Sequence, residues 1–204
     1  MNSTLKTMLS AAAILGLFSL LGIGLVTWVH QHTEMRIAEN QRQTLLHSLQ
    51  NLIPAGSYDN DLLADAIQIS AAELAAQPVT VYRARRLGKP VAAVFSTVAP
   101  DGYSGDIRLL VAVKADGSLA GVRVISHKET PGLGDLIDEN KSLWILGFDG
   151  LSLDNPPLKQ WKVKRDGGVF DQFTGATVTP RAVVRAVRSI LSFFKSNQEK
   201  LFAG

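Results

Sequence analysis

The chain of 204 residues contains no cysteine. This absence excludes disulfide bonds, iron–sulfur clusters held by protein thiolates, cysteine-bound zinc and thiol nucleophiles. Histidine is also scarce, and His30 and His32 are two positions apart, so they cannot share a helical face as a metal pair. We therefore expect no metal site, and any redox chemistry is expected to come from an organic cofactor.

No sign of charge dominates the chain. It has 21 Lys and Arg residues against 18 Asp and Glu residues, and Lys6 is the only charged side chain before Glu34. No basic stripe with interleaved aromatic residues is present, so nucleic acid is not an expected partner. The part that follows the N-terminal apolar segment, about 175 residues, is long enough for one domain with a sizeable core.

Residues 8–29 form an apolar run of 22 positions without a charge. A helix rises roughly 1.5 Å per residue, so the run reaches about 33 Å, enough to cross a hydrocarbon core of roughly 30 Å. A secretory signal peptide is the competing interpretation, but its apolar region is shorter, about 7–15 residues, and ends in small residues. Here the run ends at Trp28-Val29, and Trp suits a membrane interface. The sequence predicts a retained membrane anchor.

The charges that flank this run favour one orientation. Lys6 and the α-amino group precede it, whereas Arg36 follows it together with Glu34 and Glu39. Positive charge tends to stay on the cytoplasmic side, so the main domain is expected outside. The predicted organisation is a cytoplasmic N-terminus (1–7), a transmembrane helix (8–29), a juxtamembrane helix or stalk (30–56) and an extracytoplasmic domain (57–204).

Hydrophobic patterns predict an α+β domain of antiparallel strands with flanking helices. Residues 33–53 read as a helix that either extends the anchor as a stalk or packs on the domain. The predicted hairpins pair 79–87 with 91–98 and 107–115 with 119–126. Other predicted elements are a short helix or mixed segment at 59–74, a helix at 135–146, short strands at 161–164 and 169–170, and a closing helix at 180–197.

Polar and aromatic residues outside the motifs are expected to be structural. Asp135, Asp138 and Glu139 lie near the N-terminal end of the predicted 135–146 helix, where solvated carboxylates complement the helix dipole. Trp144 and Trp161 are predicted to be core or rim residues. His127, which has no other histidine near it in the sequence, is also interpreted as structural.

The segment Glu129–Gly134 (Glu-Thr-Pro-Gly-Leu-Gly) follows a predicted strand and precedes a predicted helix. Pro131-Gly132 is a turn dipeptide, and Gly134 permits a positive φ or a close backbone approach. Two glycines and a proline predict a stiff, low-profile loop against which a flat ring could lie. From these residues alone, an ordinary strand-to-helix turn is the simpler interpretation.

A second segment, Asp171-Gln172-Phe173-Thr174-Gly175-Ala176-Thr177, leads directly into the predicted closing helix. Thr179 is a plausible N-cap, and Pro180 suits the first turn. Apolar residues then recur at helical spacing, whereas Arg181, Arg185 and Arg188 fall mostly on another face. The turn therefore directs backbone N–H groups and the positive end of the helix dipole outward, which favours a phosphate.

These two segments carry a resemblance to a known family. Residues 171–177 resemble the flavinylation motif Asp-x-x-(Ser/Thr)-Gly-Ala-(Thr/Ser), whose last hydroxyl residue takes FMN through a phosphoester bond. Residues 129–134 resemble the other signature of the same FMN-binding domain family. With the N-terminal anchor and the length, the chain resembles the G components of Rnf (Rsx) complexes, which are membrane-bound, ion-translocating ferredoxin:NAD oxidoreductases.

The resemblance implies an electron-transport flavoprotein of the bacterial inner membrane whose main domain is periplasmic. It implies a covalent FMN on Thr177, no independent turnover, and partners among the other Rnf subunits. A flavin transferase would recognise Asp171, Gly175 and Ala176 during maturation. The residues expected to line the FMN are Glu129, Thr130, Pro131, Gly132, Leu133, Gly134, Thr174, Gly175, Ala176 and Thr179.

Two alternatives remain open at this point. The C component of the sodium-pumping NADH:quinone reductase shares the FMN domain, although it is usually longer. A non-redox, single-span scaffold with an unmodified Thr177 would only dock partners. An extracytoplasmic hydrolase lacks support, because no nucleophile, base and orienting group can be assembled from these spacings.

Overall fold

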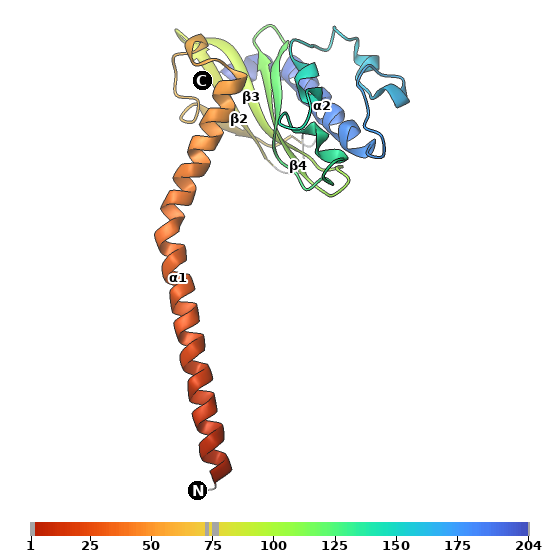
Figure 1. Ribbon diagram of the computed structural model, residues 1–204. Helices are drawn as coiled ribbons and strands as arrows, with labels where there is room; N and C mark the ends of the chain where they lie inside the picture. The colour runs from red at the N-terminus through yellow and green to blue at the C-terminus, as the bar shows by residue number, and fades with distance from the viewer. Residues whose placement is uncertain (1–2, 72–73, 75–77, 204) are drawn as a thin grey trace. The chain divides into compact units, whose positions relative to one another are not determined.

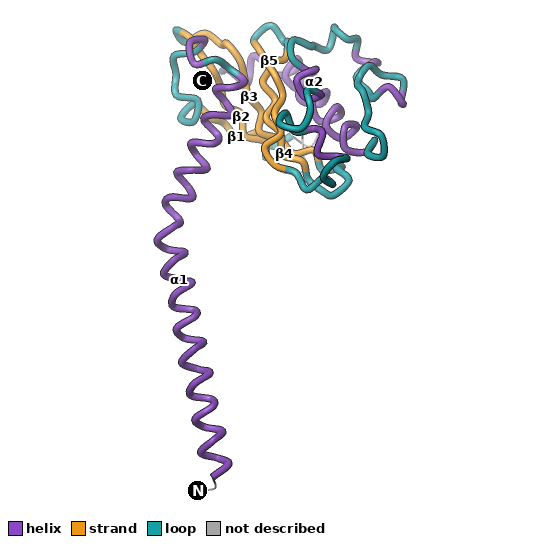
Figure 2. The backbone as a smooth tube through the Cα atoms, in the orientation of Figure 1, coloured by secondary structure: helices purple, strands orange, loops and turns teal. Residues whose placement is uncertain are grey.

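The computed structural model describes residues 3–71, 74 and 78–203. Residues 1 and 2 of the predicted cytoplasmic N-terminus, and residues 72 and 73 of the predicted 59–74 segment, lie outside the described residues. The chain divides into two compact units, residues 1–47 and residues 48–204. Figure 1 follows the chain by residue number, and Figure 2 distinguishes helices, strands and loops.

Helix α1 (Ser3–Leu52) is a single helix of 50 residues that makes up most of the first unit. Its large apolar side chains between Leu5 and Val29 are exposed rather than packed against protein. A helix that is apolar on all sides needs an apolar environment, and α1 is long and apolar enough to cross a membrane. The predicted transmembrane and juxtamembrane helices are therefore parts of one continuous element.

The last turn of α1 belongs to the second unit and is buried in it. Leu49, Leu52 and Ile53 are at most 4% exposed. Leu52 packs so closely over the sheet that a Cβ atom at Gly121 would lie 2.9 Å from its Cδ2 atom. The end of the predicted juxtamembrane helix thus packs on the domain, and the short 3-10 helix η1 (Ala55–Ser57) follows it.

The second unit is built on a five-stranded antiparallel sheet in which each strand pairs with its neighbour in sequence. The strands are β1 (Ala66–Ile69), β2 (Val79–Arg86), β3 (Lys89–Ala99), β4 (Ile107–Lys114) and β5 (Leu119–Ser126). Both predicted hairpins, β2–β3 and β4–β5, are confirmed. Their turns contain Gly88 and Gly117 with φ of 75° and 85°, which glycine adopts without strain.

Helix α2 (Val178–Phe202) packs across one face of this sheet (Figure 1). Its predicted apolar stripe is buried, with Val183 and Val187 both 0% exposed. Against it, the Phe95 ring of β3 meets the ring of Phe194 edge-on at 6.3 Å. The α+β class is confirmed, and the closing helix is longer than the predicted 180–197.

Residues 135–146 do not form the predicted α-helix. They contain two short 3-10 helices, η2 (Gly134–Ile137) and the start of η3 (Trp144–Phe148). Asp138 has an extended backbone (φ −74°, ψ 132°), and its carboxyl group accepts a hydrogen bond from the Asn140 N–H at 2.9 Å. Such local side-chain bonds compete with helical backbone bonds, so the prediction was wrong.

Asp135 also differs from its predicted solvated state. Its side chain is only 8% exposed, and its Oδ1 atom is buried without a hydrogen-bond partner among the described residues. It lies in the 3-10 helix η2, whose residues Gly134 and Ile137 are buried as well.

Two further segments are irregular. For 59–74 the predicted alternatives were a short helix or a mixed segment; its described part is mixed, with turns at 62–65 and then β1, and contains no helix. The predicted strands at 161–164 and 169–170 reduce to one parallel bridge between Val163 and Phe170. The 3-10 helix η4 (Leu158–Gln160) precedes this bridge, and η5 (Lys164–Asp166) lies between its two residues in sequence. Figure 2 shows the resulting loop-rich path between β5 and α2.

Candidate functional site

Residues 171–177 form a tight turn that leads into α2. Phe173 and Ala176 form an antiparallel bridge, and the Ala176 N–H donates to the Phe173 carbonyl at 3.1 Å. Gly175 has φ of 81° at the third position of this turn, where a positive φ favours glycine. Phe173 is 8% exposed, whereas Thr174 and Gly175 are exposed. The turn therefore presents a small tip above a buried aromatic anchor.

Thr177 is the N-cap residue of α2 and is half-buried. Its side chain makes no capping hydrogen bond to the helix. The hydroxyl group thus lies beside the unpaired backbone N–H groups and the positive dipole end of a 25-residue helix. It is free of the usual capping role of such a residue.

Thr179 is not the N-cap, so that prediction was wrong. It lies inside the first turn of α2, is 0% exposed, and its hydroxyl donates a hydrogen bond to the carboxyl group of Glu129. The helix begins earlier because Thr177 already has helical backbone angles (φ −67°, ψ −25°). Thr179 therefore ties the start of α2 to the other predicted segment.

Glu129 anchors the 129–134 segment from inside the domain. It is 4% exposed, and besides Thr179 it accepts hydrogen bonds from the backbone N–H groups of Tyr103 (3.3 Å) and Ser104 (2.9 Å). A buried carboxyl group is destabilising unless it is hydrogen-bonded, and these donors satisfy it. The His127 Nδ1 atom accepts a hydrogen bond from the Glu129 N–H at 3.1 Å, which is a structural role.

The middle of this loop is exposed, while both of its ends are buried. The Thr130 carbonyl accepts hydrogen bonds from the N–H groups of Leu133 and Gly134, both at 3.1 Å. A Cβ atom at Gly134 would lie 2.8 Å from Glu129 Oε2 and 2.9 Å from Thr179 Oγ1, so the position requires glycine. Gly132 has φ of 77°. The loop has the compact form that its composition predicts.

The structure brings the two predicted segments together. Thr179 joins Glu129, and a Cβ atom at Gly175 would lie 3.5 Å from Leu133 Cδ2. Leu133 is 41% exposed and therefore flanks the small tip of the 171–177 turn. Thr177 lies between these two points of contact in sequence. The two segments therefore lie against each other at positions on either side of Thr177 in the sequence.

Side chains from elsewhere hold the start of the turn, and sequence reasoning missed these contacts. Trp144 Nε1 donates to the Asp171 carbonyl at 2.8 Å, and the Trp144 ring meets Phe173 edge-on at 5.2 Å. Lys164 Nζ pairs with Asp171 Oδ1 at 2.6 Å on the surface. No spacing in the sequence links these residues, because irregular loops connect them. Trp144 is thus a rim residue, and Trp161, 1% exposed, is a core residue.

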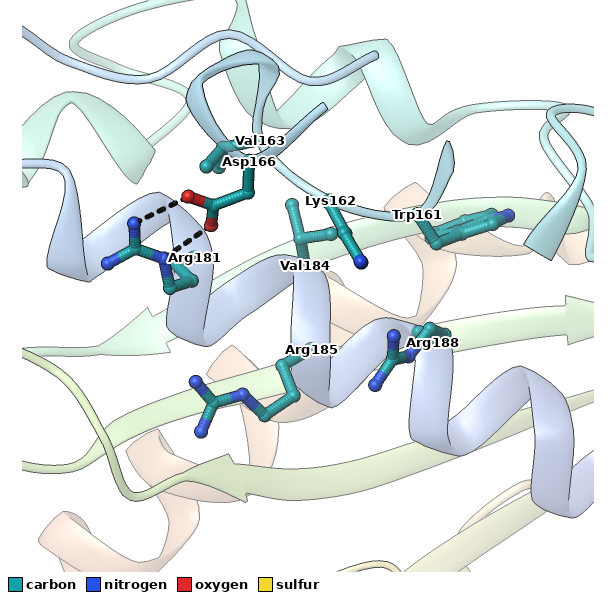
Figure 3. Close-up of a pocket in the computed structure, with 8 residues that line it drawn as sticks. All are labelled: Trp161, Lys162, Val163, Asp166, Arg181, Val184, Arg185 and Arg188. Atoms are coloured by element: carbon teal, nitrogen blue, oxygen red, sulfur yellow. Dashed lines mark hydrogen bonds and ion pairs between the residues drawn. The ribbon is translucent and has the colours of Figure 1, made fainter. Parts of the chain in front are cut away.

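A basic pocket of about 330 Å³ lies along α2, beginning one helical turn after Thr177. Figure 3 shows its lining, in which Arg181 makes two hydrogen bonds to Asp166, at 2.7 and 2.9 Å. This guanidinium group lowers the pKa of Asp166, and Asp166 in turn raises the pKa of Arg181. The cationic lining side chains are Lys162, Arg181, Arg185 and Arg188.

The donor set of the site suits an organic phosphate rather than a metal ion. Among residues 3–71, 74 and 78–203, no group of three or more His, Asp or Glu side chains could hold a metal. The hydroxyl of Thr177 can instead be esterified. The first turn of α2 supplies backbone N–H groups and positive potential for a phosphate.

The chain is similar to known proteins over nearly its whole length. Residues 102–192 match the FMN-binding domain family, and residues 1–52 match the RnfG N-terminal region. A Pseudomonas aeruginosa protein (strain UCBPP-PA14), named as the G component of an ion-translocating oxidoreductase complex, is 53% identical over 203 residues, covering 98% of this chain and 95% of that protein. Proteins of the same name from Shewanella loihica and Aliivibrio fischeri are 48% and 42% identical, covering 96% and 97% of this chain and 93% and 95% of their own lengths.

Proposed function

We propose that this chain, which belongs to the RnfG family, the G components of ion-translocating oxidoreductase complexes, carries one FMN on Thr177. The bound FMN would act as an electron relay. The similarity to known proteins establishes the family and its FMN-binding domain. The covalent bond, its position and the roles below are our proposals. This protein would pass electrons between other subunits of the complex and would have no turnover of its own.

The observation that carries the proposal is the state of the Thr177 hydroxyl. It stands at the N-terminus of a long helix, partly exposed, and makes no capping bond. Gly175 and Ala176 precede it with little or no side chain, so a bulky group can approach. A scaffold would need neither this small tip nor an uncommitted hydroxyl. The residues present therefore fit an FMN phosphate.

Attachment replaces the proton of the Thr177 hydroxyl with a bond from Oγ to phosphorus. A flavin transferase would transfer the FMN moiety from a donor in which the FMN phosphate is held in a phosphoanhydride bond; that bond breaks as the ester forms, and the other phosphate fragment of the donor and the hydroxyl proton are released. Asp171, Gly175 and Ala176 would be the residues that the transferase reads. The exposed position of Asp171, 68% for its side chain, suits such recognition.

The chain's own residues would position the bound group. When bound, FMN supplies the capacity to accept and donate electrons. The first turn of α2 directs N–H groups and positive potential at the phosphate. Leu133 lies beside Gly175 at the tip of the turn, and the exposed residues Thr130, Pro131, Gly132, Leu133 and Thr174 would line the ring. Glu129, Gly134 and Thr179 are buried and would hold that loop in place from inside the domain.

The anchor determines where this chemistry takes place. Helix α1 is consistent with a single-pass membrane protein. We propose that its N-terminus is cytoplasmic and that residues 57–204 lie in the periplasm, next to the bacterial inner membrane, since the positive charge of Lys6 precedes the span. A covalent bond there would prevent loss of the cofactor by dissociation. The sodium-pumping quinone reductase alternative is not favoured, because the relatives that match nearly the whole chain are G components of ion-translocating oxidoreductase complexes.

The proposal is tested by comparing Thr177→Ala with Thr177→Ser in cells that contain the transferase. Thr177→Ala is expected to abolish flavin fluorescence that survives denaturing electrophoresis, because no hydroxyl remains. Thr177→Ser keeps a hydroxyl and is expected to retain part or all of it. Covalent flavin on the alanine variant would overturn the assignment, and circular dichroism of both variants checks that the domain is folded.

A further inference from the structure

The exposed side of α2 carries a row of arginines that begins one turn after Thr177. Arg181, Arg185 and Arg188 follow Thr177 at helical spacings of four, four and three residues, so all four positions share one face. Thr177 itself has helical backbone angles. The opposite face, which includes Val183, is buried on the sheet. The proposed attachment residue and the arginines therefore point to the same side of the domain.

The pocket along this row has a rigid apolar floor and a cationic lining. Trp161 and Val184 are each 1% exposed and Val163 is 0% exposed, so the floor is part of the packed core. Around it stand four cationic side chains and one carboxylate, that of Asp166 (Figure 3). Cations gathered around one hollow repel one another unless anions lie between them.

The anions within the domain leave this charge incompletely balanced. Arg181 pairs with Asp166 and Arg185 pairs with Asp101, and these side chains are between 34% and 56% exposed. Exposed ion pairs contribute little free energy, so a carboxylate from another protein can exchange with them. Within the part of the chain that the structure describes, Arg188 and Lys162 form no ion pair with a carboxylate, although Lys162 acts electrostatically on Asp166.

Exposed apolar side chains lie at the Thr177 end of the row. Val178 is 42% exposed next to Thr177, and Leu133 is 41% exposed beside Gly175. Protein interfaces commonly combine an apolar centre with a polar rim, and arginine is enriched in them. The surface from Leu133 to Arg188 has this composition.

We propose that the basic surface made by Arg181, Arg185 and Arg188 of α2, its N-cap residue Thr177 and the neighbouring Lys162 docks an acidic surface of another subunit of the complex. A protein surface fits better than a single free anion, because Arg181 and Arg188 are two helical turns apart, about 10 Å along the axis. Complementary charge fixes the orientation of the two proteins. The inference rests on the proposed function, and it adds which side of the domain meets the electron-transfer partner.

The absence of cysteine allows a direct test. Ser192→Cys places the only thiol of this chain on the same face, one turn after Arg188, and leaves the 171–177 motif intact. Leu87→Cys is the control: Leu87 is 86% exposed and lies in the turn between β2 and β3. Each full-length variant is assembled into the complex in native membranes and treated with a thiol-directed photo-crosslinker. The cross-linked peptides are then identified by mass spectrometry.

We expect Ser192→Cys to cross-link to a peptide of another subunit that is rich in Asp and Glu. Adding Arg188→Glu should lower the yield about tenfold, the lower end of electrostatic effects on association. Arg188→Gln should lower the cross-linking yield less than Arg188→Glu does. It also serves as a second variant in case the charge-reversed protein misfolds. Arg86→Glu, on an exposed residue at the end of β2, should leave the yield unchanged.

The proposal is overturned if Ser192→Cys cross-links no better than Leu87→Cys, or if Arg188→Glu leaves the cross-linking yield unchanged. It is also overturned if the captured protein is the flavin transferase. The mass of the Thr177 peptide is measured in the same samples. An unmodified Thr177 in the wild-type complex would contradict the proposed function, whereas a flavinylated Thr177 without the cross-link would contradict the docking face alone.

Discussion

The two segments that meet at Thr177 are both short turns, yet they place their polar groups in opposite directions. In 129–134 the carboxyl group of Glu129 points inward and is satisfied by three donors. In 171–177 the side chains of Asp171 and Thr174 remain on the surface. The first segment fixes the shape of the site, and the second presents groups to other molecules. Substitutions should therefore affect stability in the first and modification in the second.

Glu129→Leu is expected to have the largest effect on stability. It removes the acceptor for Thr179 and for the Tyr103 and Ser104 N–H groups, so buried donors lose their partner. The free energy of unfolding should fall by about 3 kcal/mol. Asp171→Leu is the matched change in the outer segment, where an exposed ion pair contributes at most about 1 kcal/mol. Equal losses in urea unfolding of the two variants would contradict this contrast.

The two threonines at the start of α2 sharpen the same contrast within three residues. Thr179→Val removes a buried hydroxyl that is bonded to Glu129 and should destabilise the domain by about 2 kcal/mol. Thr177→Val removes a hydroxyl without a capping bond and should change stability by less than about 0.5 kcal/mol. Chemical unfolding of the unmodified proteins measures both. A larger loss for Thr177→Val would show that its hydroxyl is structural.

Gly175→Ala should have an intermediate effect. Its φ of 81° is strained for any residue with a Cβ atom, and this should lower stability by about 1 kcal/mol. A steric clash is not the cause of this loss, because the added Cβ atom would lie in ordinary van der Waals contact, 3.5 Å from Leu133 Cδ2. Gly134→Ala is the comparison in the inner segment, where the Cβ would collide with Glu129. Thermal unfolding should therefore show the greater loss for Gly134→Ala.

The smallest expected effect is a pH dependence at the edge of the site. Arg181 holds the pKa of Asp166 below its usual value. A carboxyl group with a depressed folded-state pKa stabilises the fold above its unfolded pKa, and this contribution is lost as the pH falls through the folded value. Arg181→Gln should remove it. The wild-type advantage over Arg181→Gln in unfolding should be present near neutral pH and disappear in acid; an advantage that grows in acid would contradict the argument.

The predictable parts of this molecule are those with regular periodicity or local turn chemistry. The hairpins around Gly88 and Asp116-Gly117, the buried stripe of α2 and the apolar run of α1 all follow from such patterns. The family resemblance pointed to Thr177 and to the two loops. The 135–146 segment was missed because the side chain of Asp138 bonds its own backbone neighbourhood instead of a helix.

The contacts that assemble the site were beyond local reasoning. The bond between Thr179 and Glu129 joins α2 to the loop after β5, and Trp144 reaches Asp171 across irregular chain. Such pairs arise from the packing of the whole domain, which no spacing encodes. The same limit hid that the N-cap is Thr177 rather than Thr179, since the hydroxyl of Thr179 is bonded to the distant Glu129.

The central claim is that Thr177 carries FMN, and the most direct test is mass spectrometry of the protein purified from its own membranes. Intact mass and peptide mapping would be measured on the same sample, with the peptide that contains Thr177 separated from the one that contains Thr130. We predict a mass increase equal to one esterified FMN, located on the Thr177 peptide. An unmodified Thr177 peptide from cells that contain the flavin transferase would contradict the account and favour a docking role without redox chemistry.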